Sequence, residues 1–425
     1  MTGPIETSFG AHPFYLDSGP GFGNLGTRSF SGRNPSLVIR AWGNVTEVES
    51  RGHVETHSGD PLDILRAVLT RHAIPDGDSR GLSGGGLVGY LGYGLRRWME
   101  MVPMNASDDL RLPDLWFGCY DEIETTPAST PQPADGTADV SSVARTQFGA
   151  STIAHDDYLE KVDTIKRYIH QGDVYQVNLT QRFSDDFTGD PLRLYRNLKA
   201  VNPSPFAAYL DCEAFQIISA SPERFLRYDP MTRRVETMPI KGTRPRGTPA
   251  ARDDEMRSEL LASAKDRAEH MMIVDLERND LGRVCETGSV HVPELCVPDK
   301  HPSVWHLVST ATGSLREDCD RIDLLRATFP GGSITGAPKI RAMEIIDEIE
   351  PVERGVYTGA IGYLGFDGSM DMNIAIRTMV AKDGRAHVFV GGGIVADSDP
   401  GAEYAETMDK AKALFHALNQ PGSQS

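Results

Sequence analysis

The chain has 425 residues, 39% of them hydrophobic and 24% charged, which supplies apolar material for a large core and excludes global disorder. Its formal net charge of −17 disfavours nucleic acid and acidic membrane surfaces as partners. The sequence begins without the basic and apolar pattern of a signal peptide, and no stretch reaches the roughly 18–20 apolar residues that a membrane span needs. We therefore expect a soluble protein.

The five cysteines are scattered, and none belongs to a CxxC pair; they are Cys119, Cys212, Cys285, Cys296 and Cys319. An odd number of cysteines fits poorly with a closed set of disulfides. The pattern therefore predicts free thiols and a reducing, cytoplasmic compartment.

One break in composition divides the chain. Residues 124–146 are rich in Thr, Pro, Ala, Ser and Asp and lack apolar periodicity, which is typical of a loop or linker. We therefore predict an N-terminal part, 1–123, a connecting segment, 124–148, and a second part, 149–420, in which predicted helices and strands are closely spaced.

Helical and strand patterns alternate in the second part. Tyr158, Val162, Ile165 and Ile169 have helical spacing, and Gly172 is expected to end that helix. The next segment, VYQVNLTQRF, alternates apolar and polar residues, which predicts a strand with one apolar and one polar face. Further helices are predicted near 191–201, 253–281, 321–328, 338–350 and 401–418, and strands within 206–240 and at 284–297, 305–315, 356–366, 371–382 and 386–396. Helices separated by groups of strands indicate an α+β fold.

The segment PIKGTRPRG, residues 239–247, is a turn at the end of a predicted strand. It holds Lys241 close to Arg244 and Arg246. Cationic neighbours and partial burial both lower the pKa of a lysine, which turns its amine into a nucleophile near neutral pH. The alternative is a basic surface turn.

Acidic residues supply the second candidate site. Glu403, Glu406 and Lys410 are spaced to share one face of the last predicted helix, and Glu269 stands near the start of another helical segment. A solvated charged face explains such spacing. The alternative is that Glu269 and Glu406 meet and hold Mg²⁺, which commonly takes one or two protein carboxylates and keeps water ligands.

Two glycine-rich stretches follow. FPGGSITGAPK, residues 329–339, fails the phosphate-loop pattern because Ala337 and Pro338 stand where Lys and Ser or Thr are required. Gly391, Gly392 and Gly393 suit either close approach of the backbone to a ligand or a bulge. Elsewhere, His306 and Arg377 stand in predicted strands, where each is either a packed structural residue or a ligand contact.

Several segments together resemble the chorismate-utilising enzymes: SPERF (221–225), PIKGTRPRG (239–247), KDRAEHMMIVDLERNDLGRV (265–284), HLVST (306–310), FPGGSITGAPKIRAMEIIDEIEP (329–351), GAIGYLGF (359–366) and GGGIVADSDPGAEYAETMDKA (391–411). The resemblance covers about 150–418 and is looser at 14–32 and 85–94. It implies a large α+β unit with two orthogonally packed antiparallel β-sheets between helical layers. It also implies that 1–123 interleaves with the catalytic part, 149–420, and that 124–148 is a variable surface loop.

Two positions divide that family. Members that add water carry a lysine base where this chain has Gln176, so the resemblance disfavours isochorismate and salicylate synthases. At Lys241 the segment reads PIKGT, as in aminodeoxychorismate synthase component I, whereas anthranilate synthases have PIAGT. The closest resemblance is therefore to the branch that makes 4-amino-4-deoxychorismate, on the route to p-aminobenzoate and folate.

The resemblance also implies roles for individual residues. Glu223 would be the acid that protonates the C4 hydroxyl of chorismate, and Lys241 the nucleophile that forms a covalent adduct. Mg²⁺ would be held by Glu269 and Glu406, with Glu403 in support. The substrate would contact Thr243 and His306 at the ring, and Tyr363, Arg377, Gly391, Gly392, Gly393 and Lys410 at the enolpyruvyl carboxylate.

The resemblance implies that a separate glutamine amidotransferase subunit supplies the ammonia, and no cysteine of this chain lies in the Gly-x-Cys-x-Gly elbow of a triad glutaminase. Two alternatives stay open at this point: anthranilate synthase component I of the tryptophan branch, and a non-catalytic subunit that binds chorismate or tryptophan. Whether the N-terminal part holds a tryptophan pocket is also open, because LDSGPG (16–21) departs from the usual signature.

Overall fold

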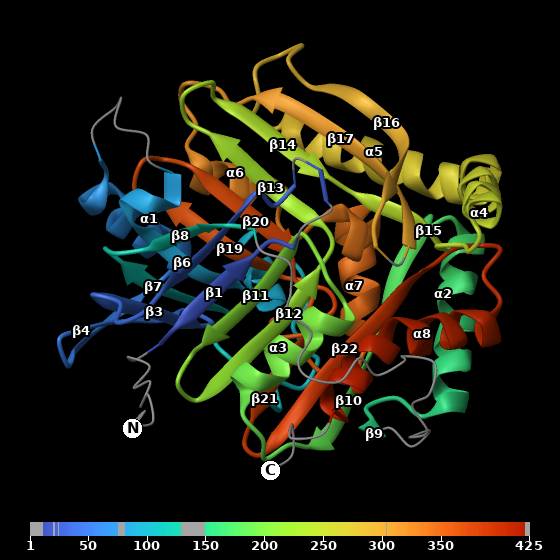
Figure 1. Cartoon of the computed structure of the whole chain (residues 1–425), viewed down its shortest axis with the longest axis horizontal. Helices are drawn as coiled ribbons and strands as arrows, with labels where there is room; N and C mark the ends of the chain where they lie inside the picture. The colour runs from blue at the N-terminus through green and yellow to red at the C-terminus, as the bar shows by residue number, and fades with distance from the viewer. Residues whose placement is uncertain are drawn as a thin grey trace.

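Two antiparallel sheets form the centre of the protein in a computed structural model that describes residues 12–19, 22–23, 25–74, 81–128, 149–302 and 304–420 (Figure 1). In the order in which its strands pair, sheet A consists of β18 (Gly336–Ala337), β10 (Gln176–Asp186), β22 (Arg385–Ile394), β21 (Thr378–Lys382), β12 (Phe215–Ser221), β11 (Phe206–Asp211), β1 (Phe14–Asp17), β2 (Arg28–Gly32) and β8 (Glu124–Pro127). The short strand β9 (Ala150–Ser151) pairs with β10.

Sheet B consists of β15 (Ile240–Pro245), β17 (Val304–Ser314), β14 (Arg234–Met238), β13 (Arg224–Asp229), β20 (Met370–Ile374), β19 (Ala360–Gly365), β6 (Gly86–Leu91), β7 (Leu115–Tyr120), β3 (Leu37–Trp42), β4 (Val45–Ser50) and β5 (His53–Ser58), and β16 (His291–Lys300) pairs with β17. Strands of the N-terminal part complete both sheets, because β1 pairs with β11 and β6 pairs with β19. The predicted α+β fold with two large antiparallel sheets is confirmed.

Helices cover the sheets: α1 (Pro61–His72), α2 (His155–Gln171), α3 (Pro191–Val201), α4 (Ala250–Ala262), α5 (Ala264–Gly282), α6 (Arg321–Thr328), α7 (Lys339–Ile349) and α8 (Pro400–Leu418). Apolar side chains of α3 and α8 pack on sheet A, for example Leu198 and Leu414 against Ile218. A second apolar cluster joins the two sheets. Burying each such side chain stabilises the fold by about 1.5–3 kcal/mol, so both layers hold the strands in place.

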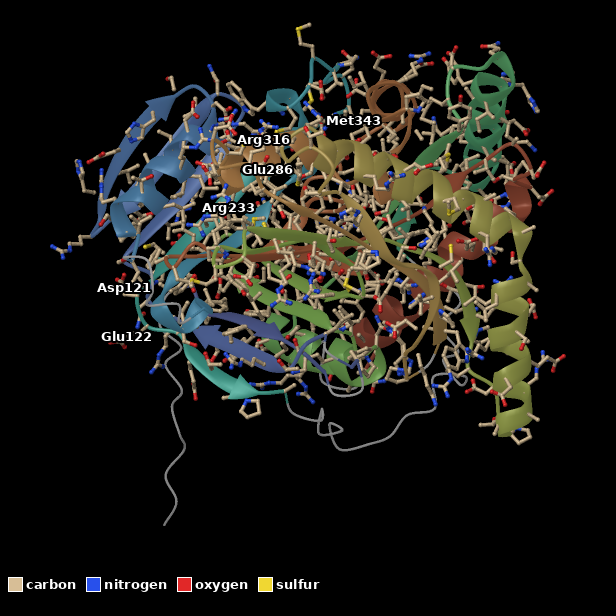
Figure 2. The ribbon with its side chains drawn as sticks, turned by 90° about the horizontal axis from the view of Figure 1, so that it is seen from above. Asp121, Glu122, Arg233, Glu286, Arg316 and Met343 are labelled. Carbon is tan, nitrogen blue, oxygen red and sulfur yellow. The ribbon has the colours of Figure 1, made fainter. Side chains whose placement is uncertain are left out.

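Three predicted elements differ in the structure. The helix expected at 253–281 is two helices, because the Ser263 side chain accepts the Asp266 N–H and caps α5. Figure 2 shows α4 and α5, in yellow, as separate rods that point in different directions. The strand expected at 371–382 divides into β20 and β21 around Arg377, whose φ of 53° is incompatible with an extended strand. β16 begins at His291, seven residues later than expected, after a turn at Gly288 with φ 81°.

Other predicted elements are confirmed. α2 ends at a left-handed Gly172, and α3 spans the expected residues. All five cysteines are free. Among the described residues, no helix is both long and apolar enough to cross a membrane.

Candidate active site

Lys241 lies half-buried on β15, where its Nζ donates a hydrogen bond of 3.1 Å to the carbonyl of Ser333. Burial lowers the pKa of this lysine and Lys410 repels its charge, whereas Glu223, Glu269 and Glu406 attract it. The lowered pKa gives Lys241 a larger neutral, nucleophilic fraction at a given pH.

The cationic neighbour of Lys241 is Lys410, and not Arg244 or Arg246 as the sequence predicted. Arg244 pairs with Glu259 and Asp266, and Arg246 pairs with Asp253. These carboxylates neutralise both arginines, so Lys410 of α8 supplies the repulsion instead.

Glu223 lies in the turn between β12 and β13 and is 4% exposed. Its Oε1 accepts a 3.4 Å hydrogen bond from the backbone N–H of Ile240, next to Lys241. Burial raises the pKa of Glu223 to about 7, against the opposing effects of Ser333 and Lys241. A carboxyl group with this pKa stays largely protonated just below neutral pH and can serve as an acid.

Ser333 joins the acid and the lysine, and sequence reasoning missed it. It belongs to the glycine-rich segment 329–339 that failed the phosphate-loop pattern. Its carbonyl accepts from Lys241, and its side chain acts on Glu223. The available signal was the pair of hydroxyl residues Ser333 and Thr335 between glycines, in a segment to which the sequence assigned no role.

Three carboxylates occupy α5 and α8. Glu403 accepts a 2.6 Å hydrogen bond from the Ser398 hydroxyl, and Glu406 pairs with Lys410 at 2.8 Å. Burial raises the pKa of Glu269 and of Glu403. Repulsion from a neighbouring carboxylate raises each of these pKa values further: Glu403 acts on Glu269, and Glu406 acts on Glu403. Among the described residues no group of three or more His, Cys, Asp or Glu side chains is arranged so that it could hold a metal ion.

The glycine run lies beside α8. Lys410 Nζ donates to the carbonyl of Gly391 at 3.0 Å, and Arg377 donates to the carbonyl of Lys410 at 2.9 Å. A Cβ at Gly392 would lie 3.5 Å from Glu403 Oε2. One network therefore contains Arg377, Lys410 and the glycines.

His306 and Thr243 face each other across β15 and β17, with 2.9 Å between the His306 Nδ1 and the Thr243 hydroxyl. Burial lowers the pKa of His306 to about 3, so the ring is neutral at physiological pH. A second imidazole, of His301, lies edge-on at 4.8 Å.

Tyr363 does not join these residues. It lies on β19 with its ring 5.8 Å from that of Phe30 and lines a cavity of about 420 Å³ with Arg224 and Asp371. Tyr357, six residues earlier in the turn before β19, is the buried tyrosine whose hydroxyl interacts electrostatically with Arg377. Within GVYTGAIGYLGF, Tyr357 is therefore the tyrosine beside Arg377, whereas the predicted Tyr363 lines that cavity.

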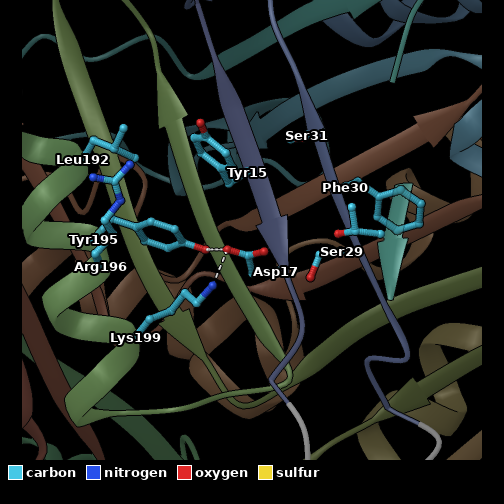
Figure 3. A pocket seen from close by; sticks show the side chains of 10 residues that line it. Tyr15, Asp17, Ser29, Phe30, Ser31, Leu192, Tyr195, Arg196 and Lys199 are labelled. Carbon is cyan, nitrogen blue, oxygen red and sulfur yellow. Dashed lines mark hydrogen bonds and ion pairs between the residues drawn. The ribbon is translucent and has the colours of Figure 1, made fainter. Parts of the chain in front are cut away.

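A smaller cavity of about 280 Å³ lies between α3 and strands β1 and β2 (Figure 3). Asp17 accepts 2.7 Å hydrogen bonds there from the Tyr195 hydroxyl and from Lys199 of α3. Neither this cavity nor the larger one is lined by Lys241 or Glu223.

Glu277 is a buried carboxyl group behind this site, and its replacement by glutamine tests its charge state. Its Oε2 accepts a 2.7 Å hydrogen bond from the Thr237 hydroxyl, and burial raises its pKa to about 8. Because the pKa of Glu277 is higher in the folded than in the unfolded protein, the fold loses stability as pH rises from the unfolded pKa towards 8. Glu277→Gln is therefore expected to stabilise the fold at pH 8 by roughly 4 kcal/mol and to have little effect below pH 5.

The measurement is the thermal unfolding temperature of both proteins between pH 5 and 9. Glu286→Gln, at an exposed carboxylate labelled in Figure 2, is the control and should change nothing. A Glu277→Gln protein that is less stable at pH 8 than at pH 5, relative to the wild type, would contradict the prediction.

Comparison with known proteins places this geometry in a family. Residues 12–416 match the family of chorismate binding enzymes. The chain is 43% identical to aminodeoxychorismate synthase component 1 of Escherichia coli (strain K12) over 91% of this chain and 88% of that one. It is 38% identical to the protein of the same name from Bacillus subtilis (strain 168), covering 96% and 92% of the two chains.

Among solved structures, anthranilate synthase component I from Streptococcus pneumoniae TIGR4 has a TM-score of 0.78 at 33% identity, covering 97% of this chain and 95% of that one. These matches extend across both sheets and include the segments that carry Lys241, Glu223 and the α8 carboxylates. The chain belongs to the family of chorismate binding enzymes.

Proposed function

We propose that this protein converts chorismate and ammonia to 4-amino-4-deoxychorismate, the reaction of an aminodeoxychorismate synthase component 1. The observation that carries the proposal is a lysine of lowered pKa beside a carboxyl group of raised pKa, with Ser333 in contact with both. Both aminodeoxychorismate synthase relatives named above carry this activity in their names.

Lys241 and Glu223 act as a nucleophile and an acid. Glu223 gives its proton to the C4 hydroxyl of chorismate, which leaves as water, while the neutral Lys241 Nζ attacks C2 and both ring double bonds shift. Ammonia then attacks C4, both double bonds shift back, and the C2–Nζ bond breaks to release a neutral lysine. The new C4 ammonium returns one proton to the Glu223 carboxylate, which restores the acid.

Other residues hold the substrate. Arg377, Tyr357 and Lys410, with the amides of Gly391–Gly393, would bind the enolpyruvyl carboxylate, since they form one connected network. The neutral His306 and Thr243 would line the ring.

In charge and ligand type, three carboxylates of α5 and α8 suit a hard cation. Glu269, Glu403 and Glu406 present oxygen ligands whose mutual repulsion a cation would relieve, and Lys410 and Lys265 offset part of their charge in this structure. Glu269 and Glu406, with Glu403 in support, would hold Mg²⁺, which when bound neutralises the ring carboxylate of chorismate. Ser398 orients Glu403 through its 2.6 Å hydrogen bond.

Binding of Mg²⁺ is tested without turnover. Millimolar MgCl₂ is expected to raise the unfolding temperature of the wild type and to have no such effect on Glu406→Gln, because a ligand that binds only the native state stabilises it. Glu255→Gln, at an exposed carboxylate of α4, is the control and should respond like the wild type. An equal response of Glu406→Gln would remove Glu406 from the proposed site.

Ammonia would be supplied by a glutamine amidotransferase subunit, since the relatives are named as one component of a synthase. The five free cysteines suit a reducing compartment such as the cytoplasm.

The experiment that tests the function is mass spectrometry of the products from chorismate, Mg²⁺ and ammonium chloride. An aminated chorismate with no pyruvate is the expected result. Anthranilate with pyruvate would instead assign the protein to the activity in the name of the Streptococcus pneumoniae structure. No turnover with ammonium would favour a binding subunit.

A further inference from the structure

A second buried histidine, His301, lies next to His306. His301 is 5% exposed, and its ring centre lies 4.8 Å from that of His306, with the two ring planes at 89°. The ring of Phe22, from the N-terminal part of the chain, packs against His301 at 4.9 Å. Rings at these distances and tilts are in direct edge-to-face contact. His301 therefore contacts both an N-terminal side chain and a histidine of the candidate active site.

Asp299 fixes the orientation of the His301 ring. The His301 Nε2 lies 3.0 Å from Asp299 Oδ2, and this hydrogen bond lowers the pKa of the carboxyl group. Because an ionised carboxylate only accepts hydrogen bonds, the Nε2 of His301 must carry the hydrogen. The imidazole thus has a defined donor nitrogen and a defined direction in which it faces.

The backbone of His301 is held as well. Its N–H donates to the Val304 carbonyl at 2.9 Å, and its own carbonyl accepts a 2.9 Å hydrogen bond from Arg246 Nη1. These bonds lie in the turn that joins β16 to β17, next to the directly paired residues Asp299 and His306. The position of the His301 ring relative to His306 is therefore set by both its side chain and its backbone.

Two polar contacts of His306 come from β15. The Thr243 hydroxyl lies 2.9 Å from the His306 Nδ1, and the backbone of Gly242 also forms a hydrogen bond with the ring. The ring of His301 approaches instead from the turn between β16 and β17, and it limits how far the imidazole can tilt away from β15. After burial, His301 is also the strongest influence that lowers the pKa of His306, which favours the neutral ring.

We propose that His301 is a positioning residue that holds the ring of His306 in the orientation that faces the substrate. The inference rests on the proposed function, in which His306 lines the ring of chorismate. A group displaced by about 1 Å in an active site can lower the rate by about 100-fold, because reacting groups have to meet in a narrow range of geometry. Loss of the His301 ring should therefore lower kcat, and it should do so only while His306 is present.

A double-mutant cycle tests this role in the full chain, with chorismate, Mg²⁺ and ammonium chloride at fixed pH. His301→Ala is expected to lower kcat by about tenfold or more, while KM for chorismate changes by less than about threefold. In a His306→Ala protein the same substitution should have no further effect on kcat, because His301 then has no ring to position. A residue with a merely structural role would lower kcat by the same factor in both backgrounds.

A conservative variant separates the ring contact from the hydrogen bond. His301→Phe keeps an aromatic ring against His306 but loses the hydrogen bond to Asp299, whose side chain is 37% exposed and can bind water instead. This variant is expected to keep kcat within about threefold of the wild type. His387→Ala is the matched control, because His387 is also a buried histidine but contacts Ser184 on sheet A. It should leave kcat unchanged, and the unfolding temperature of every variant is measured in parallel.

The outcomes separate the two proposals. If the wild type makes no aminated product, the proposed function is wrong and this inference fails with it. If the wild type aminates chorismate but His301→Ala lowers kcat equally with and without His306, only the role of His301 is wrong. A His301→Ala protein with the kcat of the wild type would have the same meaning.

Discussion

Replacement of Lys241 by alanine is expected to lower kcat for 4-amino-4-deoxychorismate by about 10³-fold or more, the range in which loss of a nucleophile falls. The reason is that the variant cannot form the bond to C2 that allows ammonia to enter at C4. The Ser333 carbonyl accepts a hydrogen bond from this lysine, and the charges of Glu223, Lys410 and Glu269 act on it.

The readout is product analysis by mass spectrometry together with the rate of chorismate loss. Lys412→Ala, at an exposed lysine of α8 that pairs with Asp409, is the matched control and should retain activity. Any product that the Lys241→Ala protein still makes is informative: anthranilate would show that ammonia reaches C2 once the side chain is gone. Unchanged formation of aminodeoxychorismate would exclude the covalent mechanism.

Glu223→Gln is expected to lower kcat by about 10²–10⁴-fold, because glutamine cannot donate the proton that lets the C4 hydroxyl leave as water. Binding of chorismate should change little, since glutamine keeps the shape of the side chain. The backbone N–H of Ile240 can still donate to the glutamine oxygen, so the turn between β12 and β13 should persist.

The pH dependence of the wild type follows from the same group. Glu223 is active when protonated, and burial raises its pKa to about 7, so kcat/KM for chorismate should fall as pH rises through about 7. Lys241 is active when neutral, and its lowered pKa extends activity to lower pH than an ordinary lysine would allow. A wild-type profile that stays flat between pH 6 and 8.5 would contradict the assignment of Glu223 as the acid.

Strand and helix positions were predictable wherever local chemistry decides them. Gly172 ends α2 because a residue in the left-handed region is needed there, and Pro191 starts α3 because it needs no N–H partner. The break at Ser263 was not predicted, since both flanking segments have helical composition and only the capping hydrogen bond divides them. The left-handed backbone conformation of Arg377 was not predictable either, because arginine has no preference for that region.

The site was only partly predictable. The order of the sequence segments suggested Lys241, Glu223 and the α8 carboxylates, but the partners of each side chain depend on contacts between distant elements. Lys410 takes the place expected of Arg244 and Arg246 because carboxylates of α4 and α5 neutralise those arginines. Tyr357 lies in the turn before β19 and Tyr363 lies within β19. The local sequence does not indicate which of the two is close to Arg377.

The strand order of both sheets limits how this enzyme can be divided. β1 lies between β11 and β2, and β6 lies between β19 and β7, so each sheet crosses from the first part of the chain to the second. A fragment that began near residue 149 would expose the unpaired backbone of β11 and β19, two long apolar edges that favour aggregation. The catalytic half is therefore not a portable module: recombination between relatives has to exchange both halves together, or preserve the pairing surfaces that join them.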